Sequence, residues 1–441
     1  MIRECSPLPM PESVPAHSDP SSLISPDAWQ RLESATLSVV HRIQPTISSE
    51  HLRTAVIDYV QRLFKVRAGY QVLPFGSVPL KTYLPDGDID LTLFDPAISD
   101  ENLENDVYAI LKSEEQSKDS EFEVNAVQFV PAEVKLVKCR VQNIDVDISV
   151  NQIGGLYTVH FLEKVNKKFG KNHLFRRSIM LIKDWCYYEA CILGSHRGFI
   201  CTYALETLVL YIFHIFYNSL DGPLAVLYRF LDYYSKFDWN NKGISLFGPI
   251  SLSSLPELVT EPPDTNDEGF LLREEFLKEW AEAFTVTFRN CEKNPQVFSR
   301  KFLNIVDPLN QSNNLGRSVR KKNFDRIRSA FDIGARKLRK ILQVPACFVI
   351  DGINRFFSNT VIRPVVLISC FDDVLLMTDH VTNDSMAPIL RAERGSKCSS
   401  SNNSYDVLSD QFSNFNISDS NNHGSVKQNE CDSLAEHKEI K

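Results

Sequence analysis

Several features that would assign this protein to a class at once are missing from its sequence. The ten cysteines include no C-x-x-C pair and no Cys/His cluster with zinc spacing, which excludes the common zinc modules. Most lie beside apolar residues, so we expect free thiols buried in a reducing compartment. No basic segment followed by an apolar run opens the chain, and we therefore expect a protein of the nucleus or cytoplasm that is not secreted.

A positive net charge is also missing. The chain has 48 Lys and Arg residues against 56 Asp and Glu residues, a formal net charge of −8, which excludes a uniformly basic nucleic-acid binder. The most apolar window, from Phe199 to Tyr217, contains Glu206 and His214 and is barely long enough to cross a bilayer. We interpret this window as a buried helix and expect no membrane contact.

The sequence does contain a change of pattern along its 441 residues, which are enough for two or three domains. Alternating apolar and polar residues give way to long helical stretches after Gly154. The composition of both ends, rich in Ser with Pro or Asn, predicts disorder. We expect six segments: 1–28 disordered, 29–64 helical and packed with the helical domain, 65–160 mixed α/β, 161–345 a mainly helical domain, 346–382 a C-terminal extension, and 383–441 a disordered tail.

Strands are predicted by five short runs of apolar, β-branched and alternating residues. These runs are 71–75, 89–93, 122–129, 134–140 and 144–150. In the last run the alternation places Asp145 and Asp147 on one face, opposite the apolar side chains.

The segment after the first strand has the residues best suited to chemistry. Gly76 and Ser77 follow that strand, and their backbone N–H groups with the Ser77 hydroxyl could hold phosphate oxygens at a helix start. A tight turn at residues 85–87 then leads into the second strand. Asp88 and Asp90 are two residues apart on this strand, so both carboxylates project from one face.

Carboxylates held so close together predict a divalent cation. Like charges raise the pKa of at least one carboxyl group unless a cation offsets them. Mg²⁺ prefers oxygen ligands and usually takes one or two carboxylates together with substrate phosphates. Asp147 can supply a third carboxylate, and such a set can hold two ions in a phosphoryl-transfer site. We therefore predict that Asp88, Asp90 and Asp147 are catalytic and bind Mg²⁺ or Mn²⁺.

This pattern resembles the DNA-polymerase-β-like nucleotidyltransferase superfamily. It consists of Gly-Ser, ten residues, Asp-Ile-Asp and a later Asp-Ile-Ser, and it is most similar to the branch of noncanonical poly(A) polymerases and terminal uridylyltransferases. The resemblance covers about residues 30–345. It implies an α+β fold, with a nucleotidyltransferase palm (a mixed sheet with helices) joined to a mainly helical substrate-binding domain like that of poly(A) polymerase and oligoadenylate synthase. It also implies that Asp147, rather than Asp145, is the third metal ligand, and we expect the site to lie between the two domains.

The same resemblance implies a set of nucleotide-binding residues. Lys183, two residues before Trp185, occupies the place of the family's triphosphate-binding lysine. A second family lysine, four residues further on, is Tyr187 here, which weakens triphosphate binding unless another basic residue substitutes. Thr202 and Tyr203 resemble the Ser-Tyr pair whose tyrosine stacks on the nucleobase.

A loop at residues 306–319 resembles the family's nucleotide recognition loop, in which Asp307 is expected to contact the base edge. Some uridylyltransferases carry a histidine six residues after this aspartate, where this chain has Asn313, and this difference favours ATP over UTP. The implied nucleotide-binding set is therefore Gly76, Ser77, Lys183, Thr202, Tyr203, Asp307 and Asn313.

The function implied is a template-independent RNA 3′-terminal nucleotidyltransferase, most similar to a poly(A) polymerase that transfers adenylyl groups from ATP to an RNA 3′-hydroxyl. One alternative is a terminal uridylyltransferase that uses UTP, and another is a catalytically silent relative that acts as a scaffold. Transfer to a protein or to a small molecule would use the same metal chemistry.

Contacts with RNA are expected at two groups of basic residues, because phosphate contacts of this kind bind any RNA sequence. No separate RNA-binding module is visible, which indicates modest RNA affinity or a partner protein that recruits the substrate. The first group is Lys164, Lys167, Lys168, Lys171, Arg176 and Arg177, and the second is Arg317, Arg320, Lys321, Lys322, Arg326 and Arg328.

Overall fold

The computed structural model describes most of the chain between residues 24 and 363, and the part of the predicted C-terminal extension after residue 363 lies outside the described residues. The described residues are 24–95, 97–131, 135–262, 271–288, 297–345 and 347–363. The predicted disordered tail, 383–441, lies outside the described residues, as do residues 1–23 of the predicted disordered N-terminus. None of the helices in the described ranges is both long and apolar enough to span a membrane.

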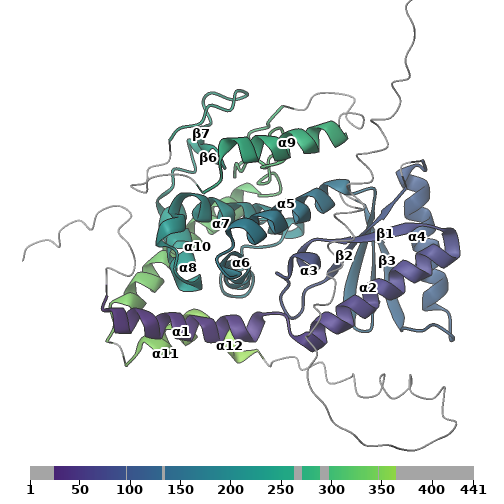
Figure 1. Cartoon of the computed structure of the whole chain (residues 1–441), viewed down its shortest axis with the longest axis horizontal. Helices are drawn as coiled ribbons and strands as arrows, with labels where there is room; N and C mark the ends of the chain where they lie inside the picture. The colour runs from purple at the N-terminus through teal and green to yellow at the C-terminus, as the bar shows by residue number, and fades with distance from the viewer. Residues whose placement is uncertain are drawn as a thin grey trace, which may run out of the picture. The chain divides into compact units, whose positions relative to one another are not determined.

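A mixed five-stranded sheet forms the first half of the fold (Figure 1). Its strands run in the order β1-β2-β5-β4-β3; β2 and β5 are parallel, and the other neighbours are antiparallel. All five strands expected from the alternating pattern are present, with ends within two residues of those predicted. The strands are β1 (Gln71–Phe75), β2 (Ile89–Phe94), β3 (Val124–Val130), β4 (Leu136–Val141) and β5 (Ile144–Val150).

Two helices, α2 (Ile47–Ala68) and α4 (Asp100–Glu115), cover one face of this sheet. Val56 of α2 and Val107 of α4 are fully buried in the same core as Leu91 of β2. Because side chains alternate along a strand, the residues beside Leu91 point to the opposite face of the sheet. The acidic side chains of β2 and β5 therefore project away from the helical layer.

The expectation that the helices of residues 29–64 pack with the helical domain is wrong for α2. Its apolar side chains, including Leu52, Val60 and Phe64, belong to the core beneath the sheet. Helix α1 (Pro26–Ile43) does contact helices of the second domain, where Leu32 and Val39 enter its core. An amphipathic pattern shows that a helix buries one face, but it does not show which neighbour covers that face.

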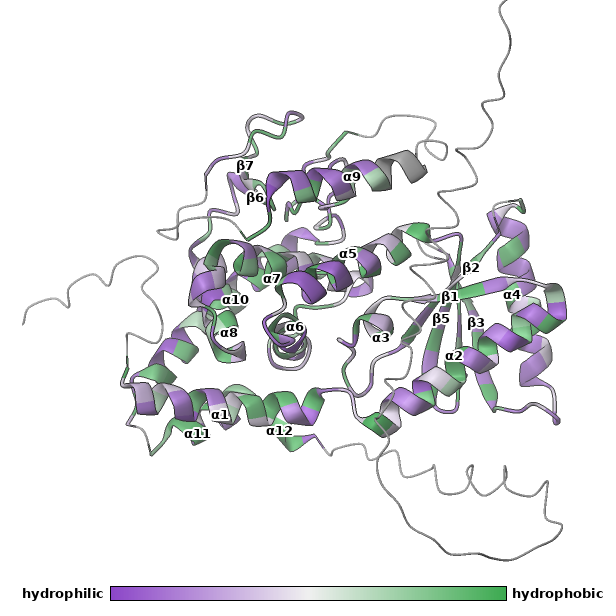
Figure 2. Ribbon diagram, viewed as in Figure 1, coloured by the Kyte–Doolittle hydropathy of each residue, from purple (hydrophilic) through white to green (hydrophobic). Residues whose placement is uncertain are grey.

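The second half of the fold is mainly helical and is built around the buried α7. Figure 2 shows that exposed helices such as α10 and α1 carry mixed polar and apolar surfaces. Its elements are α5 (Ile153–Phe169), α6 (Leu174–Asp184), a π-helical turn η2 (Trp185–Glu189), α7 (Thr202–Phe216), α8 (Pro223–Lys236), a hairpin of β6 (Lys242–Ser245) and β7 (Gly248–Ser251), α9 (Glu274–Phe288), α10 (Lys321–Leu342), α11 (Val349–Phe356) and α12 (Ser358–Ile362).

Helix α10 illustrates why these stretches fold as they do. Phe324, Ile327, Phe331 and Leu338 recur at helical spacing and are buried, while charged residues occupy the outer face. Gly334 lies on the buried face, where an added Cβ would come within 2.7 Å of the Trp185 ring. A mixed sheet with helices, joined to a mainly helical domain, confirms the predicted fold class.

Candidate active site

Three carboxylates meet on the open face of the sheet. Asp90 of β2 and Asp147 of β5 are direct partners in the parallel register, and Asp88 lies just before β2. One carboxylate oxygen of each of the three residues lies within 4.8 Å of the others. The pairing of β2 with β5 therefore brings together residues that are almost sixty positions apart in the sequence.

Asp145 lies on the same side of β5 but outside this group. Its carboxylate is paired with Arg140 across the strands at 2.8 Å and is 60% exposed, whereas the Asp147 side chain is only 13% exposed. Asp147, and not Asp145, therefore faces the other two carboxylates.

Gly76 approaches Asp90 so closely that no other residue fits there. An added Cβ would lie 2.3 Å from Asp90 Oδ2, and the φ of +73° is one that L side chains rarely adopt. Ser77 begins the short helix α3 (Ser77–Leu80), and its carbonyl accepts a hydrogen bond from the Thr82 N–H at 2.9 Å. The predicted phosphate-binding turn thus lies directly against the carboxylate group.

Burial and the closeness of these acids raise the pKa values of Asp90 and Asp147. Burial raises the pKa of Asp90 to about 8, and the neighbouring Asp88 and Asp147 contribute to this rise against the opposing charges of Lys183 and Lys138. Burial also raises the pKa of Asp147, although a hydrogen bond from Lys138 works in the opposite direction. The folded chain therefore holds these groups in a state that a bound cation would relieve.

Lys138 supplies part of that positive charge. It lies opposite Asp147 on β4, and its Nζ is 2.5 Å from Asp147 Oδ2. Among the described residues no hydrogen-bond partner reaches the other oxygen, Asp147 Oδ1, although it is buried. An unpaired buried carboxylate oxygen beside two further carboxylates fits a divalent metal ion, because oxygen ligands are what Mg²⁺ and Mn²⁺ prefer.

Three residues from distant segments fix the turn that leads into β2. The buried Arg53 of α2 donates to the carbonyl oxygens of Gly87 at 2.8 Å and Pro85 at 3.3 Å. Asp86, at the tip of the turn, accepts from the Tyr188 hydroxyl and from Arg363, the latter at 2.9 Å. These contacts set the direction in which the strand, and with it Asp88, begins.

Lys183, on α6 of the helical domain, interacts electrostatically with the carboxylate group. Its Nζ lies 3.5 Å from the Thr82 carbonyl oxygen. Burial raises the pKa of Asp90 and of Glu206, and the charge of Lys183 partly offsets both rises. The ring of Trp185, two residues on, packs against the Gly334 backbone of α10 and so orients the helix that carries Lys183.

Tyr187 follows in the π-helical turn, where the family places a lysine. Its side chain is exposed, and the guanidinium of Arg197 lies 5.8 Å from its ring centroid. A basic residue thus stands beside the position from which the lysine is missing.

The predicted nucleotide loop is tied to α7 by a set of hydrogen bonds. Asp307 Oδ1 accepts from the Tyr203 hydroxyl and from the Leu309 N–H, both at 2.9 Å. Asp307 Oδ2 accepts from the Asn313 amide at 2.8 Å, and Asn313 Oδ1 accepts from Arg317 at 2.9 Å. Burial raises the pKa of Asp307, while these donors hold it down. Thr202 begins α7 beside Tyr203. The Thr202–Tyr203 pair therefore lies close to Asp307 and Asn313, the other residues predicted to bind the base.

Not every basic residue predicted for RNA is available to it. Arg176 is largely buried in an ion pair with Glu163, and Lys171 donates to the carbonyl oxygens of Tyr217 and Leu220, just after α7. These two residues stabilise the helical domain. The first basic group is therefore reduced to the exposed Lys164, Lys167 and Lys168, with the partly exposed Arg177.

Sequence reasoning missed the supporting residues Arg53, Lys138 and Arg363. Arg53 and Arg363 act through contacts with distant segments, and Lys138 acts through its partner on the neighbouring strand. For Lys138 a signal existed, because two predicted adjacent strands joined by a short turn place it opposite Asp147. No sequence spacing links Arg53 or Arg363 to the turn at residues 85–87.

The fold and the carboxylate group together define a class, the nucleotidyltransferases with a palm and an attached substrate-binding domain. The family model for the central palm domain of mitochondrial-like poly(A) RNA polymerase matches residues 32–166. The model for the PAP/OAS1 substrate-binding domain matches residues 169–361. The chain belongs to the noncanonical poly(A) and poly(U) polymerase branch of the nucleotidyltransferases.

Curated relatives agree with this assignment at low identity. Protein HESO1 of Arabidopsis thaliana is 24% identical over 336 residues, which are 70% of this chain and 64% of the relative. Poly(A) RNA polymerase cid14 of Schizosaccharomyces pombe is 26% identical over 220 residues, 48% of this chain and 31% of the relative. The chain thus spans less than two thirds of the length of these relatives.

Solved structures share the fold. A Cid1 poly(U) polymerase mutant bound to MgATP has a TM-score of 0.54 at 18% identity, covering 74% of this chain and 98% of that one. A cytoplasmic RNA terminal U-transferase has a TM-score of 0.51 at 18% identity, with 73% and 98% covered. The polymerase core of TRAMP, an RNA surveillance complex, has a TM-score of 0.51 at 19% identity, with 76% and 97% covered.

Proposed function

We propose that this chain is a template-independent RNA 3′-terminal nucleotidyltransferase that transfers adenylyl groups from ATP. The observation that carries the proposal is the group of Asp88, Asp90 and Asp147 on two neighbouring strands, with Lys183 of the helical domain facing it. The chain's membership of a family of poly(A) and poly(U) polymerases supports this chemistry.

In this proposal most of the catalysis is positioning. Two Mg²⁺ ions held by the three carboxylates would supply positive charge to the attacking 3′-hydroxyl and the leaving pyrophosphate. The backbone at Gly76 and the Ser77 hydroxyl would hold the triphosphate, and Lys183 would balance its charge. Fixed donors of this kind act without rearranging when charge develops in the transition state.

The donor base is proposed to be adenine because of Asn313. This side chain is held between Asp307 and Arg317, so a neutral amide stands at the position where some uridylyltransferases carry a histidine. The Cid1 poly(U) polymerase structure bound to MgATP is itself a histidine-to-asparagine mutant.

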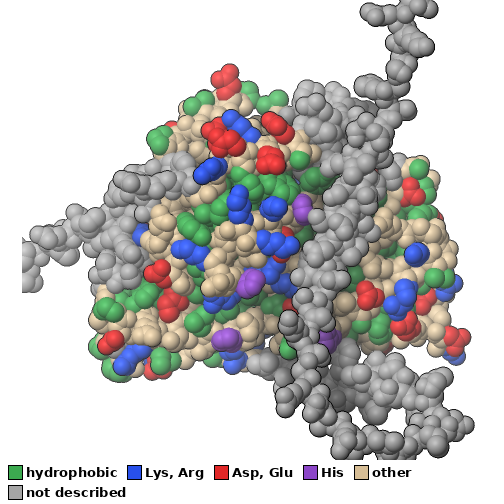
Figure 3. Space-filling model, viewed as in Figure 1, with side chains coloured by type: hydrophobic (Ala, Val, Ile, Leu, Met, Phe, Trp, Pro, Cys, Tyr) green, Lys and Arg blue, Asp and Glu red, His purple; other side chains and the backbone are tan. Residues whose placement is uncertain are grey.

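The acceptor is proposed to be RNA, bound through exposed cations. Figure 3 shows Lys and Arg side chains gathered in the middle of the face in view, over α5 and α6. Lys164, Lys167 and Lys168 are exposed at the end of α5, and Arg317, Arg320 and Lys321 are exposed before and at the start of α10. Because Arg176 is taken up by an ion pair and Lys171 by backbone carbonyl oxygens, we propose modest RNA affinity and a partner protein that delivers the substrate.

The test is primer extension with purified protein, a short labelled RNA, Mg²⁺ and each of the four NTPs separately. We expect a ladder with ATP that disappears in the Asp88→Ala variant. A ladder that survives this substitution would refute the catalytic assignment, and no ladder with any NTP would support a silent scaffold instead.

The second candidate is a terminal uridylyltransferase. It is favoured by neighbours described as a terminal U-transferase and as a poly(U) polymerase. Competition of ATP against UTP over one RNA primer separates the two, since both use the same carboxylates. A preference for UTP would reverse the proposal for the donor and leave the chemistry intact.

A further inference from the structure

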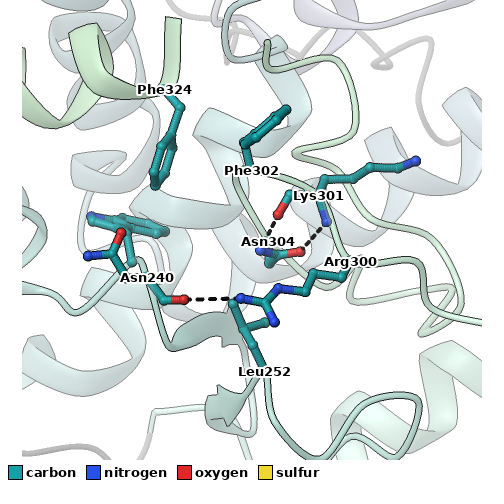
Figure 4. Close-up of a pocket in the computed structure, with 8 residues that line it drawn as sticks. Asn240, Leu252, Arg300, Lys301, Phe302, Asn304 and Phe324 are labelled. Carbon is teal, nitrogen blue, oxygen red and sulfur yellow. Dashed lines mark hydrogen bonds between the residues drawn. The ribbon is translucent and has the colours of Figure 1, made fainter. Parts of the chain in front are cut away.

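A pocket lies in the helical domain behind the predicted nucleotide loop. Four parts of the chain line it: the loop after α8, the residue after β7, the segment before the nucleotide loop, and α10. Its volume is about 410 Å³, within the range of pockets that hold small organic ligands. In Figure 4, Phe324 and Phe302 lie on one side of it and Leu252 on the other. Neither the carboxylate group nor the Asp307 network contributes a residue to its lining.

The lining combines aromatic surface with positive charge. Trp239, Leu252 and Phe324 are almost completely buried and form an apolar floor. Phe302 is 48% exposed, a large apolar side chain left open to solvent beside the exposed cations Arg300 and Lys301. No carboxylate occurs among the described residues that line the pocket. Flat apolar surfaces next to unopposed cations match a nucleobase attached to a phosphate.

Arg328 of the second basic group lies beside the pocket. Arg328, one turn after Phe324 on α10, lies over the Phe324 ring at 5.5 Å and donates to the Asn240 side chain at 3.2 Å. Arg300 reaches the carbonyl oxygen of the same residue at 3.4 Å (Figure 4). Cations thus flank the pocket on two sides, and a chain of phosphates could pass from one to the other.

A hydrogen-bonded bridge connects the pocket to the nucleotide loop. Asn304, which lines the pocket, accepts from the Asn314 amide at 3.0 Å, and Asn314 Oδ1 accepts from the N–H groups of Ile305 and Gly316. Asn314 directly follows Asn313 of the loop. The same short segment therefore has one side in the pocket and the other beside the predicted base site.

We propose that this pocket binds a nucleotide of the single-stranded RNA substrate, upstream of its 3′ end. The base lies against Phe302 and the aromatic floor, and the flanking phosphates contact Arg300, Lys301 and Arg328. This inference rests on the proposed function, since it assigns part of the RNA that the enzyme extends. It explains how a chain of net negative charge holds a polyanion without a separate RNA-binding module.

The test is RNA binding without NTP, measured by fluorescence anisotropy of a labelled 15-nucleotide RNA. Phe302→Ala removes the exposed stacking surface, and we expect the Kd to rise about tenfold. The double variant Arg300→Ala, Lys301→Ala should reduce the slope of log Kd against log salt by roughly 1.4, or about 0.7 for each phosphate that is no longer neutralised. The KM for ATP should stay unchanged in both variants, because neither touches the predicted nucleotide loop.

The matched control is Phe348→Ala, which removes another exposed phenylalanine, 58% exposed and outside the pocket, and should leave the Kd unchanged. Thermal unfolding confirms that each variant is folded. Wild-type affinity in Phe302→Ala and in the double variant would overturn the inference, even if the protein extends RNA normally. If the wild type extends no RNA at all but Phe302→Ala still weakens RNA binding, the proposed function fails and the pocket assignment stands.

Discussion

The palm and the helical domain each contain an aspartate that is at least partly buried, and the two aspartates differ in how their carboxylate oxygens are satisfied. Asp307 is buried, and both of its oxygens accept hydrogen bonds, from Tyr203, Leu309 and Asn313. Asp90 lies beside two other carboxylates, and burial with these like charges raises its pKa to about 8. Its partner across the sheet, Asp147, has one buried oxygen that no described residue reaches.

This difference indicates that Asp307 positions its neighbours, whereas the palm carboxylates are suited to bind a ligand. A satisfied carboxylate such as Asp307 stabilises the fold and fixes its neighbours before any nucleotide arrives. A group of unsatisfied carboxylates costs stability until a cation offsets the repulsion. We therefore expect substitutions in the two regions to have opposite effects on stability.

The largest expected effect is on catalysis by Asp90→Asn. This change removes a metal ligand and keeps the shape, so extension should fall by about a thousandfold or more. Without Mg²⁺ the variant should be at least as stable as the wild type, because one of three like charges is gone. Extension assays and thermal unfolding in EDTA measure the two quantities. Asp145→Asn, on the same face of β5 but exposed, is the control, and an equal loss in that variant would contradict the assignment.

Asp307→Ala should show the reverse pattern for stability. It leaves the Tyr203 hydroxyl, the Leu309 N–H and the Asn313 amide without their acceptor, and we expect a loss of about 1–3 kcal/mol in the free energy of unfolding. Urea unfolding at pH 7 measures this loss. Wild-type stability in the variant would show that the network does not hold the loop.

Asn313→His tests the role of the loop in choosing the donor. Placing the uridylyltransferase-type residue at this position should raise the ratio of kcat/KM for UTP to that for ATP by about tenfold, roughly 1.4 kcal/mol of discrimination. Ser312→His, one residue away and hydrogen-bonded to Asn310 instead of Asp307, is the control. An unchanged ratio in Asn313→His would remove the support that this residue gives to ATP.

The smallest expected effect is on the pH dependence of stability. A carboxyl group with a raised pKa binds more protons in the folded than in the unfolded chain, so its contribution to stability falls as pH rises from about 4 to about 8. Other buried acids, such as Glu33 and Asp184, titrate in the same range, so the comparison must be between variants. In EDTA the Tm of Asp90→Asn should fall less than that of the wild type over this interval, by roughly 2–4 °C. Parallel curves would show that Asp90 does not titrate as inferred.

The features that depend on a local residue pattern could be predicted from the sequence. Period-two alternation located the five strands and put Asp90 and Asp147 on the polar faces of their own strands, because side-chain direction follows from the strand itself. The pairing of β2 with β5, which brings these two residues together, is not a local pattern. The β6–β7 hairpin escaped detection, since its four-residue strands contain Gly243 and Pro249 and lack a clear alternation.

Interactions between distant segments could not be read in this way. The burial of α2 on the sheet, the donation from Arg53 to the turn before β2, and the ion pair of Arg363 with Asp86 depend on tertiary packing that no spacing encodes. The same is true of the pocket beside Phe302, which takes its walls from four separate stretches of chain.

The central claim, that the palm carboxylates are a metal site, is tested most directly by counting bound Mn²⁺. Electron paramagnetic resonance titration would be done with a non-hydrolysable ATP analogue on the wild type, Asp90→Asn and Asp145→Asn. We expect two protein-dependent ions in the wild type and in Asp145→Asn, and fewer in Asp90→Asn. Equal Mn²⁺ binding by all three proteins would contradict the account.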